Sequence, residues 1–282
     1  MEIKATEVKA LREATGAGMM ECKKALVECN GDAEAAAKLL KEKGLAAVAK
    51  RAERATKEGR IFVKQEGGKA VMAELTCETD FVAKNDKFIA LGEAIVAEAL
   101  AKGYSEVNEA LSNMMLDLAT EIRENMSVRR VTAIDIPADC VFAKYIHSDG
   151  KTGVMTVIES DNADAVNNAD VKAFAYDCCL HVAAFTPAFI RREDVSEAYI
   201  NEQKEVFMAQ MNNDEKVASK PENVKQGILN GKINKHLADI CFLDQPFVKD
   251  DKVSVAKKME EVGKAAGAKL ALKSVTTFIL GA

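Results

Sequence analysis

The 282-residue sequence contains no tryptophan, only four prolines and only 5% aromatic residues. So few prolines, beside abundant alanine, glutamate and lysine, favour helices over an all-β sandwich with its frequent turns. Hydrophobic residues make up 48% and charged residues 29% of the chain, which excludes a chain disordered by composition. The length indicates about two domains. We therefore expect a soluble, helix-rich protein with more than one buried core.

Segments for targeting and for membranes are also missing. No apolar run approaches the roughly 18 to 20 residues needed to cross a bilayer, and residues 1–5 lack the apolar core of a signal peptide. We therefore expect a cytoplasmic protein with no membrane partner. Lys plus Arg number 39 and Asp plus Glu 44, which gives a net charge of −5. This acidic balance is unfavourable for a surface that grips nucleic acid, so we expect no direct nucleic-acid partner.

One stretch, from Lys38 to Arg60, is locally basic. Such a stretch usually indicates a solvated helix face, and contact with a ribosome or RNA is the alternative.

The common motifs of enzymes are absent as well. The sequence has neither the phosphate-binding pattern Gly-x-x-x-x-Gly-Lys-Ser/Thr nor Gly-x-Gly-x-x-Gly after a predicted strand. Seven cysteines without a Cys-x-x-Cys pair indicate reduced, mostly buried side chains. Cys178 and His181 could form half a metal site or a thiolate pair, but a buried cysteine beside a packed histidine is the plainer interpretation. We expect no enzyme, no cofactor and no metal.

Residues 1–54 are predicted to form three short helices and a linker. Gly16 and Gly18 interrupt the first helix, Asn30 and Gly31 end the second, and Asp32 is placed to cap the third. Residues 45–58 are alanine-rich and charged, which indicates a helical linker.

Two faces are predicted on the second helix. A core-facing stripe is expected from the spacing of the residues Met19, Cys22, Leu26 and Cys29. Met20, Lys23 and Val27 fall on its flank. We expect Met20 to be partly exposed as a partner contact, with a wide core face as the alternative.

From Gly59 the hydrophobic pattern alternates, as in strands. It predicts a hairpin turning at residues 66–69, a loop at 78–85, helices at 86–102 and 111–125, and a strand at 128–136. A second hairpin at residues 141–158 and a helix at 167–184 repeat this order, which indicates a weak internal duplication. We predict an α+β fold with two related core subdomains. They comprise residues 55–140 and residues 141–190 with 241–282.

Residues 191–240 carry two long helical stretches, one on either side of Pro221, each with a narrow apolar seam. This pattern predicts an inserted antiparallel helical hairpin, or coiled coil. A loop at residues 243–248, a helix at 252–265 and a closing strand at 270–280 are expected to follow.

The predicted loop contains the tetrapeptide Thr79-Asp80-Phe81-Val82. An Asp beside a large apolar ring, on a loop positioned by rigid elements, could project as a charged wedge. The alternative is that Phe81 and Val82 fill the gap between strand and helix.

Several sequence words occur in one order along nearly the whole chain. They are Leu11-Arg12, Thr15 to Met20, Cys22 to Leu26, Thr79 to Asn85, Asn125, Arg129 to Val131, Tyr145-x-His147, Gly153-Val154, His181 to Ala184, Lys220 to Glu222 and Gln245 to Val248. On these words the sequence resembles the bacterial elongation factor Ts family. The resemblance implies an N-terminal three-helix ubiquitin-associated-like module, two related α+β core subdomains and an inserted helical hairpin. Some family members have Ile-Gly where this chain has Ile122-Arg123, so a contact there is expected to differ.

The resemblance also implies a function. The family promotes exchange of guanine nucleotide on elongation factor Tu, so the expected partner is that GTPase in its GDP form. Pairing of two such complexes is a further expectation. The residues implied in displacing Mg²⁺ are Thr79, Asp80, Phe81 and Val82, and those implied in gripping the partner are Arg12, Met19, Met20, Lys23 and His147. The alternative function is a helical adaptor that binds a ubiquitin-like or ribosomal partner without exchange activity.

Overall fold

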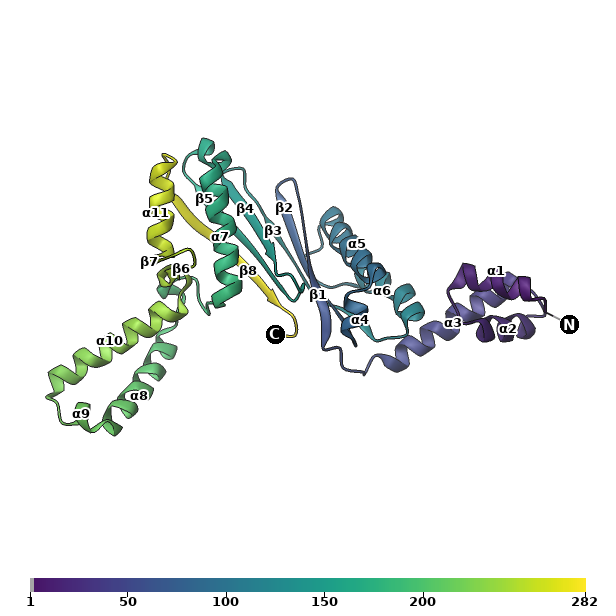
Figure 1. Cartoon of the computed structure of the whole chain (residues 1–282), viewed down its shortest axis with the longest axis horizontal. Helices are drawn as coiled ribbons and strands as arrows, with labels where there is room; N and C mark the ends of the chain where they lie inside the picture. The colour runs from purple at the N-terminus through teal and green to yellow at the C-terminus, as the bar shows by residue number, and fades with distance from the viewer. Residues whose placement is uncertain (1–2) are drawn as a thin grey trace. The chain divides into compact units, whose positions relative to one another are not determined.

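A computed structural model describes residues 3–282 and divides the chain into two units (Figure 1). Unit 1 comprises the residues up to Asp135 together with Ile146–Gly153 and Phe278–Ala282, and unit 2 comprises Ile136–Tyr145 and Val154–Thr277. Both contain helices and antiparallel strands, which confirms the α+β class. The finer partition into residues 1–54, 55–140, 141–190 with 241–282, and 191–240 stays a prediction.

Three helices open unit 1: α1 (Ala5–Thr15), α2 (Met19–Glu28) and α3 (Ala33–Arg51). Gly16 ends α1 in the left-handed conformation with φ 69°, and the Asp32 carboxylate caps α3 by accepting the backbone N–H groups of Glu34 and Ala35. We call these three helices the head. Its small core consists of Val8, Leu11, Cys22, Ala25, Leu26 and Ala36.

Two predictions for the head are corrected. In the stripe expected on α2, Cys22 and Leu26 are buried, but Met19 is 43% exposed because it is the first helical residue and lies at the edge of a small core. The first half of the predicted helical linker belongs to α3. The second half is an irregular segment from Ala52 to Lys57.

The rest of unit 1 is built on an antiparallel sheet of strands β1 (Glu58–Glu66), β2 (Lys69–Cys77) and β3 (Met126–Asp135), in the order β1-β2-β3. Glu66 pairs with Lys69 at the predicted hairpin turn, and Cys77 pairs with Met126 at the other end of β2. Helices α5 (Asp86–Lys102) and α6 (Glu109–Ile122) pack on the sheet (Figure 1). Their shared core includes Leu75, Phe88, Ile95 and Leu111.

The predicted loop at 78–85 is not fully irregular, because it contains the short helix α4 (Asp80–Ala83). The predicted helix at 111–125 instead starts at Glu109 and ends at Ile122, where Arg123 takes the left-handed conformation with φ 67°. This sharp ending leaves only residues 123–125 between α6 and β3.

A second sheet has strands β4 (Cys140–Ile146), β5 (Thr152–Ser160) and β8 (Leu270–Ile279), in the order β4-β5-β8. The 3-10 helix η1 (Ala163–Asn167) and helix α7 (Ala169–Phe185) follow β5, close to the predicted helix at 167–184. In the predicted loop at 243–248 the structure has η3 (Phe242–Asp244) and β6 (Pro246–Phe247), and β6 pairs with the unforeseen strand β7 (Asp250–Ser254). Helix α11 (Val255–Ala265) begins where Ser254 caps it.

A further segment of unit 2 begins with η2 (Arg192–Asp194) and forms helices α8 (Glu197–Asn213), α9 (Glu215–Ala218) and α10 (Glu222–Ile240). The Tyr199 hydroxyl lies 3.0 Å from Nε2 of His236, and the Lys232 ammonium lies 5.7 Å from the ring centre of Phe207. Early residues of α8 therefore meet late residues of α10, which is an antiparallel arrangement. Pro221 precedes α10, as the sequence pattern predicted.

Candidate functional site

The predicted tetrapeptide lies directly after β2, on and around α4. The Thr79 hydroxyl oxygen caps this helix by accepting the backbone N–H of Val82 at 3.4 Å. Val82 is buried in the core of unit 1, whereas Phe81 is 82% exposed. The alternative in which both side chains fill the gap between strand and helix is therefore right for Val82 and wrong for Phe81.

Asp80 lies beside Phe81 in the first turn of α4. Its carboxylate accepts a hydrogen bond from the Lys84 ammonium at 2.7 Å, and this bond is the main reason that the pKa of Asp80 is lowered. Asp80 is therefore ionised at neutral pH. We call Asp80 and Phe81 the wedge, because together they present a negative charge beside an uncovered aromatic ring.

Glu124, for which no role was predicted from the sequence, supports the start of helix α4 and so the wedge. Its carboxylate accepts the backbone N–H groups of Glu78 and Thr79 at 3.1 and 3.0 Å, and the Thr79 hydroxyl at 2.7 Å. The contact joins residues 45 positions apart, so no local pattern reveals it. The nearest residue among the family words was its neighbour Asn125.

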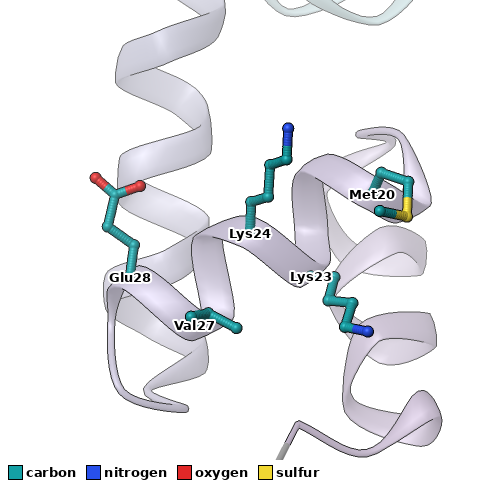
Figure 2. Close-up of a pocket in the computed structure, with 5 residues that line it drawn as sticks. All are labelled: Met20, Lys23, Lys24, Val27 and Glu28. Carbon is teal, nitrogen blue, oxygen red and sulfur yellow. The ribbon is translucent and has the colours of Figure 1, made fainter.

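A second exposed surface lies on α2. Met20 is 65% and Val27 55% exposed, which confirms the expected exposure of Met20, while its contact with a partner stays a prediction. An open hollow of about 300 Å³ is lined by Met20, Lys23, Lys24, Val27 and Glu28. Figure 2 shows that all five side chains come from α2, with Lys23 and Val27 directed to one side of the helix and Lys24 to the other. We call Met19, Met20, Lys23 and Val27 the head surface.

The two remaining predicted residues are also exposed. Arg12 lies in the last turn of α1, and His147 lies at the turn between β4 and β5. The His147 backbone N–H donates to the Thr152 carbonyl at 2.9 Å, and Ile61 of β1 donates to the Gly150 carbonyl at 2.8 Å. The turn that carries His147 therefore lies against the first sheet, within unit 1.

Lys151, in the turn that carries His147, is affected by the charge of Asp80 in the wedge. The Lys151 ammonium pairs with the Glu58 carboxylate at 2.7 Å, and that bond is the main reason that the pKa of Lys151 is raised. The charge of Asp80 adds to the effect, so Asp80 lies within electrostatic range of this turn. The predicted residues thus occupy two regions of unit 1: the head, and the wedge with the His147 turn.

The alternative of a thiol or metal site at Cys178 and His181 finds no support. Burial raises the pKa of Cys178 well above its usual value and lowers the pKa of His181. His181 Nδ1 accepts the Val248 backbone N–H at 3.2 Å, and Nε2 lies 2.8 Å from Oε1 of Gln245. Both ring nitrogens are thus engaged in hydrogen bonds within the fold. Within residues 3–282 no group of three or more possible ligands could hold a metal ion.

Three basic residues of the stretch from Lys38 to Arg60 pair with carboxylates of the same chain. Lys43 pairs with Glu28 at 2.6 Å, and Lys41 lies 3.9 Å from Asp117. Arg54 pairs with a carboxylate too, that of Glu78. These contacts favour a solvated helix face over an RNA contact.

Within the described part of the chain no helix is long and apolar enough to cross a membrane. Two surfaces on which uncovered apolar side chains stand beside charged ones are typical of a protein that docks onto another protein. Fold and surfaces thus define the class of interaction proteins of mixed α+β architecture.

Comparisons with known proteins give the family. A family model described as Elongation factor TS matches residues 78–282. The chain is 57% identical to elongation factor Ts of Treponema denticola over 281 residues, covering 100% of this chain and 99% of the relative. It is 53% identical to the Treponema pallidum protein over 294 residues, again covering 100% and 99%. Identity to the Borrelia recurrentis protein is 42% over 265 residues, or 94% of each chain.

The chain therefore belongs to the elongation factor Ts family, which confirms the resemblance found in the sequence. Membership implies a nucleotide exchange factor for elongation factor Tu in translation elongation, and not a catalyst of a chemical reaction.

Proposed function

We propose that this chain binds elongation factor Tu carrying GDP, promotes release of GDP by perturbing the Mg²⁺ and phosphate site, and so allows GTP to bind. The observation that carries the proposal is the wedge: an aromatic ring that is 82% exposed, beside an ionised carboxylate, on a short helix whose other side is buried. We further propose that the head is a ubiquitin-associated-like module and that the two sheets belong to related subdomains.

The partner's chemistry explains why a wedge is useful. A GTPase holds GDP through a phosphate-binding loop and a helix N-terminus, with Mg²⁺ bridging protein and phosphate oxygens. Phe81 inserts between helices of the nucleotide domain, and Asp80 engages polar or positive-dipole groups there. This displacement disturbs the elements that support Mg²⁺ and phosphate, so GDP leaves faster.

The size of the effect requires more than the wedge. A thousandfold faster release needs a barrier lower by about 4 kcal/mol, whereas burying one aromatic side chain contributes about 1.5 to 3 kcal/mol. We assign the remainder to Thr79 and Val82, which hold the wedge, and we propose that a separate grip on other parts of the partner sets the affinity. The gripping residues are Arg12, Met19, Met20, Lys23 and His147.

Stopped-flow release of a fluorescent GDP from elongation factor Tu tests this function. Addition of this chain is expected to accelerate release by orders of magnitude over spontaneous release. A helical adaptor would bind a ubiquitin-like or ribosomal partner and leave the release rate unchanged; an unchanged rate would refute the exchange function. Light scattering of the nucleotide-free complex at rising concentration tests the proposed pairing of two complexes.

A further inference from the structure

The segment between α6 and β3, residues Arg123 to Asn125, contacts three other parts of unit 1. Arg123 ends α6 in the left-handed conformation, with φ 67°, and its guanidinium pairs with Glu21 of α2. The Asn125 side-chain amide donates to the carbonyls of Ala52 and Arg54, at 3.1 and 2.7 Å. Glu124 is thus held between two residues that are each tied to another part of the fold.

Glu124 meets the backbone at the point where α4 begins. A helix of four residues is not stable by itself. Its first N–H groups lack partners within the helix, and it has too few helical hydrogen bonds to offset the cost of nucleation. Here the three hydrogen bonds to the Glu124 carboxylate fix the N–H groups of Glu78 and Thr79 and the Thr79 hydroxyl.

The remaining contacts of this region hold the same helix, α4, on its other sides. The Glu78 carboxylate accepts the Asn125 backbone N–H at 2.6 Å and pairs with the Arg54 guanidinium at 3.3 Å. On the far side, Val82 and Ala83 are buried in the core of unit 1. Every side chain from Glu78 to Ala83 is therefore bound or buried except the ring of Phe81, which is 82% exposed.

We propose that Glu124 is a positioning residue for Phe81: by fixing the start of α4 before the partner arrives, it holds the ring in the direction in which it inserts. This inference rests on the proposed exchange function. Holding the ring in advance lowers the ordering cost of docking and lets binding energy act on the partner. Glu124 itself acts through Thr79 and Glu78 and needs no contact with the GTPase.

The test compares Glu124→Ala with Glu124→Gln. In Glu124→Gln, the amide oxygen can accept the two backbone N–H groups while the amide NH₂ donates to the Thr79 hydroxyl oxygen, so all three contacts can be kept. In Glu124→Ala they are lost. Stopped-flow GDP release is measured at rising concentrations of each variant, which separates the maximal rate from the half-saturating concentration. Glu121→Ala is the matched control. Glu121 is also acidic and lies in the last turn of α6, close to Glu124 in the chain, but it pairs with Lys87 and not with the start of α4.

We expect the maximal rate to fall roughly tenfold in Glu124→Ala and to stay near wild type in Glu124→Gln and Glu121→Ala. In a Phe81→Ala background, Glu124→Ala should have little further effect, because there is no ring left to position. Equal maximal rates in wild type and Glu124→Ala would overturn the proposal, and so would full additivity of the two substitutions.

Hydrogen exchange in the free protein gives a readout independent of the partner. Peptides covering residues 78–85 should exchange at least about tenfold faster in Glu124→Ala than in Glu124→Gln, while peptides from β1 and α5 are unchanged. Unchanged exchange at residues 78–85 would overturn the positioning role. If wild type fails to accelerate GDP release, the exchange function is refuted, and this measurement still decides whether Glu124 fixes α4.

Discussion

The head surface and the wedge are both exposed, but they are built differently. The head surface spreads four exposed side chains over α2, a ten-residue helix held by its own buried face at Cys22, Ala25 and Leu26. The wedge places one aromatic ring on a four-residue helix, and this helix depends on hydrogen bonds to Glu124, 45 residues further along the chain. A broad surface suits affinity, whereas a single braced ring suits local displacement of a bound partner. We therefore expect the head to set how tightly the partner binds, and the wedge to set how fast GDP leaves.

The largest expected effect separates the two faces of α2. Leu26→Ala removes a fully buried side chain from the core of the head and should cost about 2 to 5 kcal/mol in the free energy of unfolding. Met20→Ala, on the exposed face, should leave stability within about 0.5 kcal/mol of wild type. Urea unfolding, with hydrogen exchange to locate the loss in α1 to α3, measures both. Equal destabilisation by the two variants would place Met20 in the core and remove it from the head surface.

The next effect concerns the wedge. Phe81→Ala should lower the maximal rate of GDP release by about 10- to 100-fold, since the burial of one aromatic side chain is lost. Thermal stability should not change, because the ring is exposed. Phe185→Ala is the matched control, because Phe185 is also an exposed phenylalanine but lies on α7, outside the head and the wedge. A loss of the same size in Phe185→Ala, or no loss in Phe81→Ala, would show that the ring is not the acting group.

A smaller effect is expected at the head surface. Met20→Ala should raise the half-saturating concentration about fivefold, which corresponds to about 1 kcal/mol of binding free energy. The maximal release rate should stay at the wild-type value, because Met20 does not contact the wedge. Stopped-flow titration distinguishes the two quantities, and a lowered maximal rate with an unchanged midpoint would reverse the roles that we assign.

The smallest effect concerns the Asp80–Lys84 pair. Lys84→Ala should raise the pKa of Asp80 toward its ordinary value, which an NMR titration of the carboxyl group can follow. A lowered pKa favours the folded state above the ordinary Asp value of about 3.9, and this contribution is lost as the pH falls below that value. The variant should therefore lose less stability than wild type in acid. At pH 7 Asp80 is ionised in both proteins, so the rate of GDP release should stay close to the wild-type value.

Regular elements with strong periodic patterns were predictable from the sequence. The helix predicted at 86–102 runs from Asp86 to Lys102, and the hairpin turns where the Glu66-Gly67-Gly68-Lys69 pattern indicated. The short strands β6 and β7 were missed because they pair over too few residues to show alternation. Met19 was misplaced because helical spacing shows the face of a residue but not its nearness to the end of a small core.

The candidate site was predictable in its residues but not in its supports. The pattern at Asp80 and Phe81 fits either a wedge or a plug, and only the packing of Val82 beneath the helix leaves Phe81 outside. The bracing by Glu124 depends on the antiparallel pairing of β2 with β3, which brings residues 78 and 125 together. Such a contact depends on how the strands pair, so it cannot be predicted from the local sequence.

One equilibrium measurement tests the division of roles most directly: calorimetric binding of this chain to elongation factor Tu, with and without saturating GDP. Linkage requires that GDP weaken binding of this chain by the same factor by which this chain weakens binding of GDP. We predict that Phe81→Ala shrinks this coupling factor, whereas Met20→Ala weakens binding equally in both conditions and leaves the factor unchanged. If Phe81→Ala weakens both affinities equally and preserves the coupling, the wedge only adds affinity, and the account is contradicted.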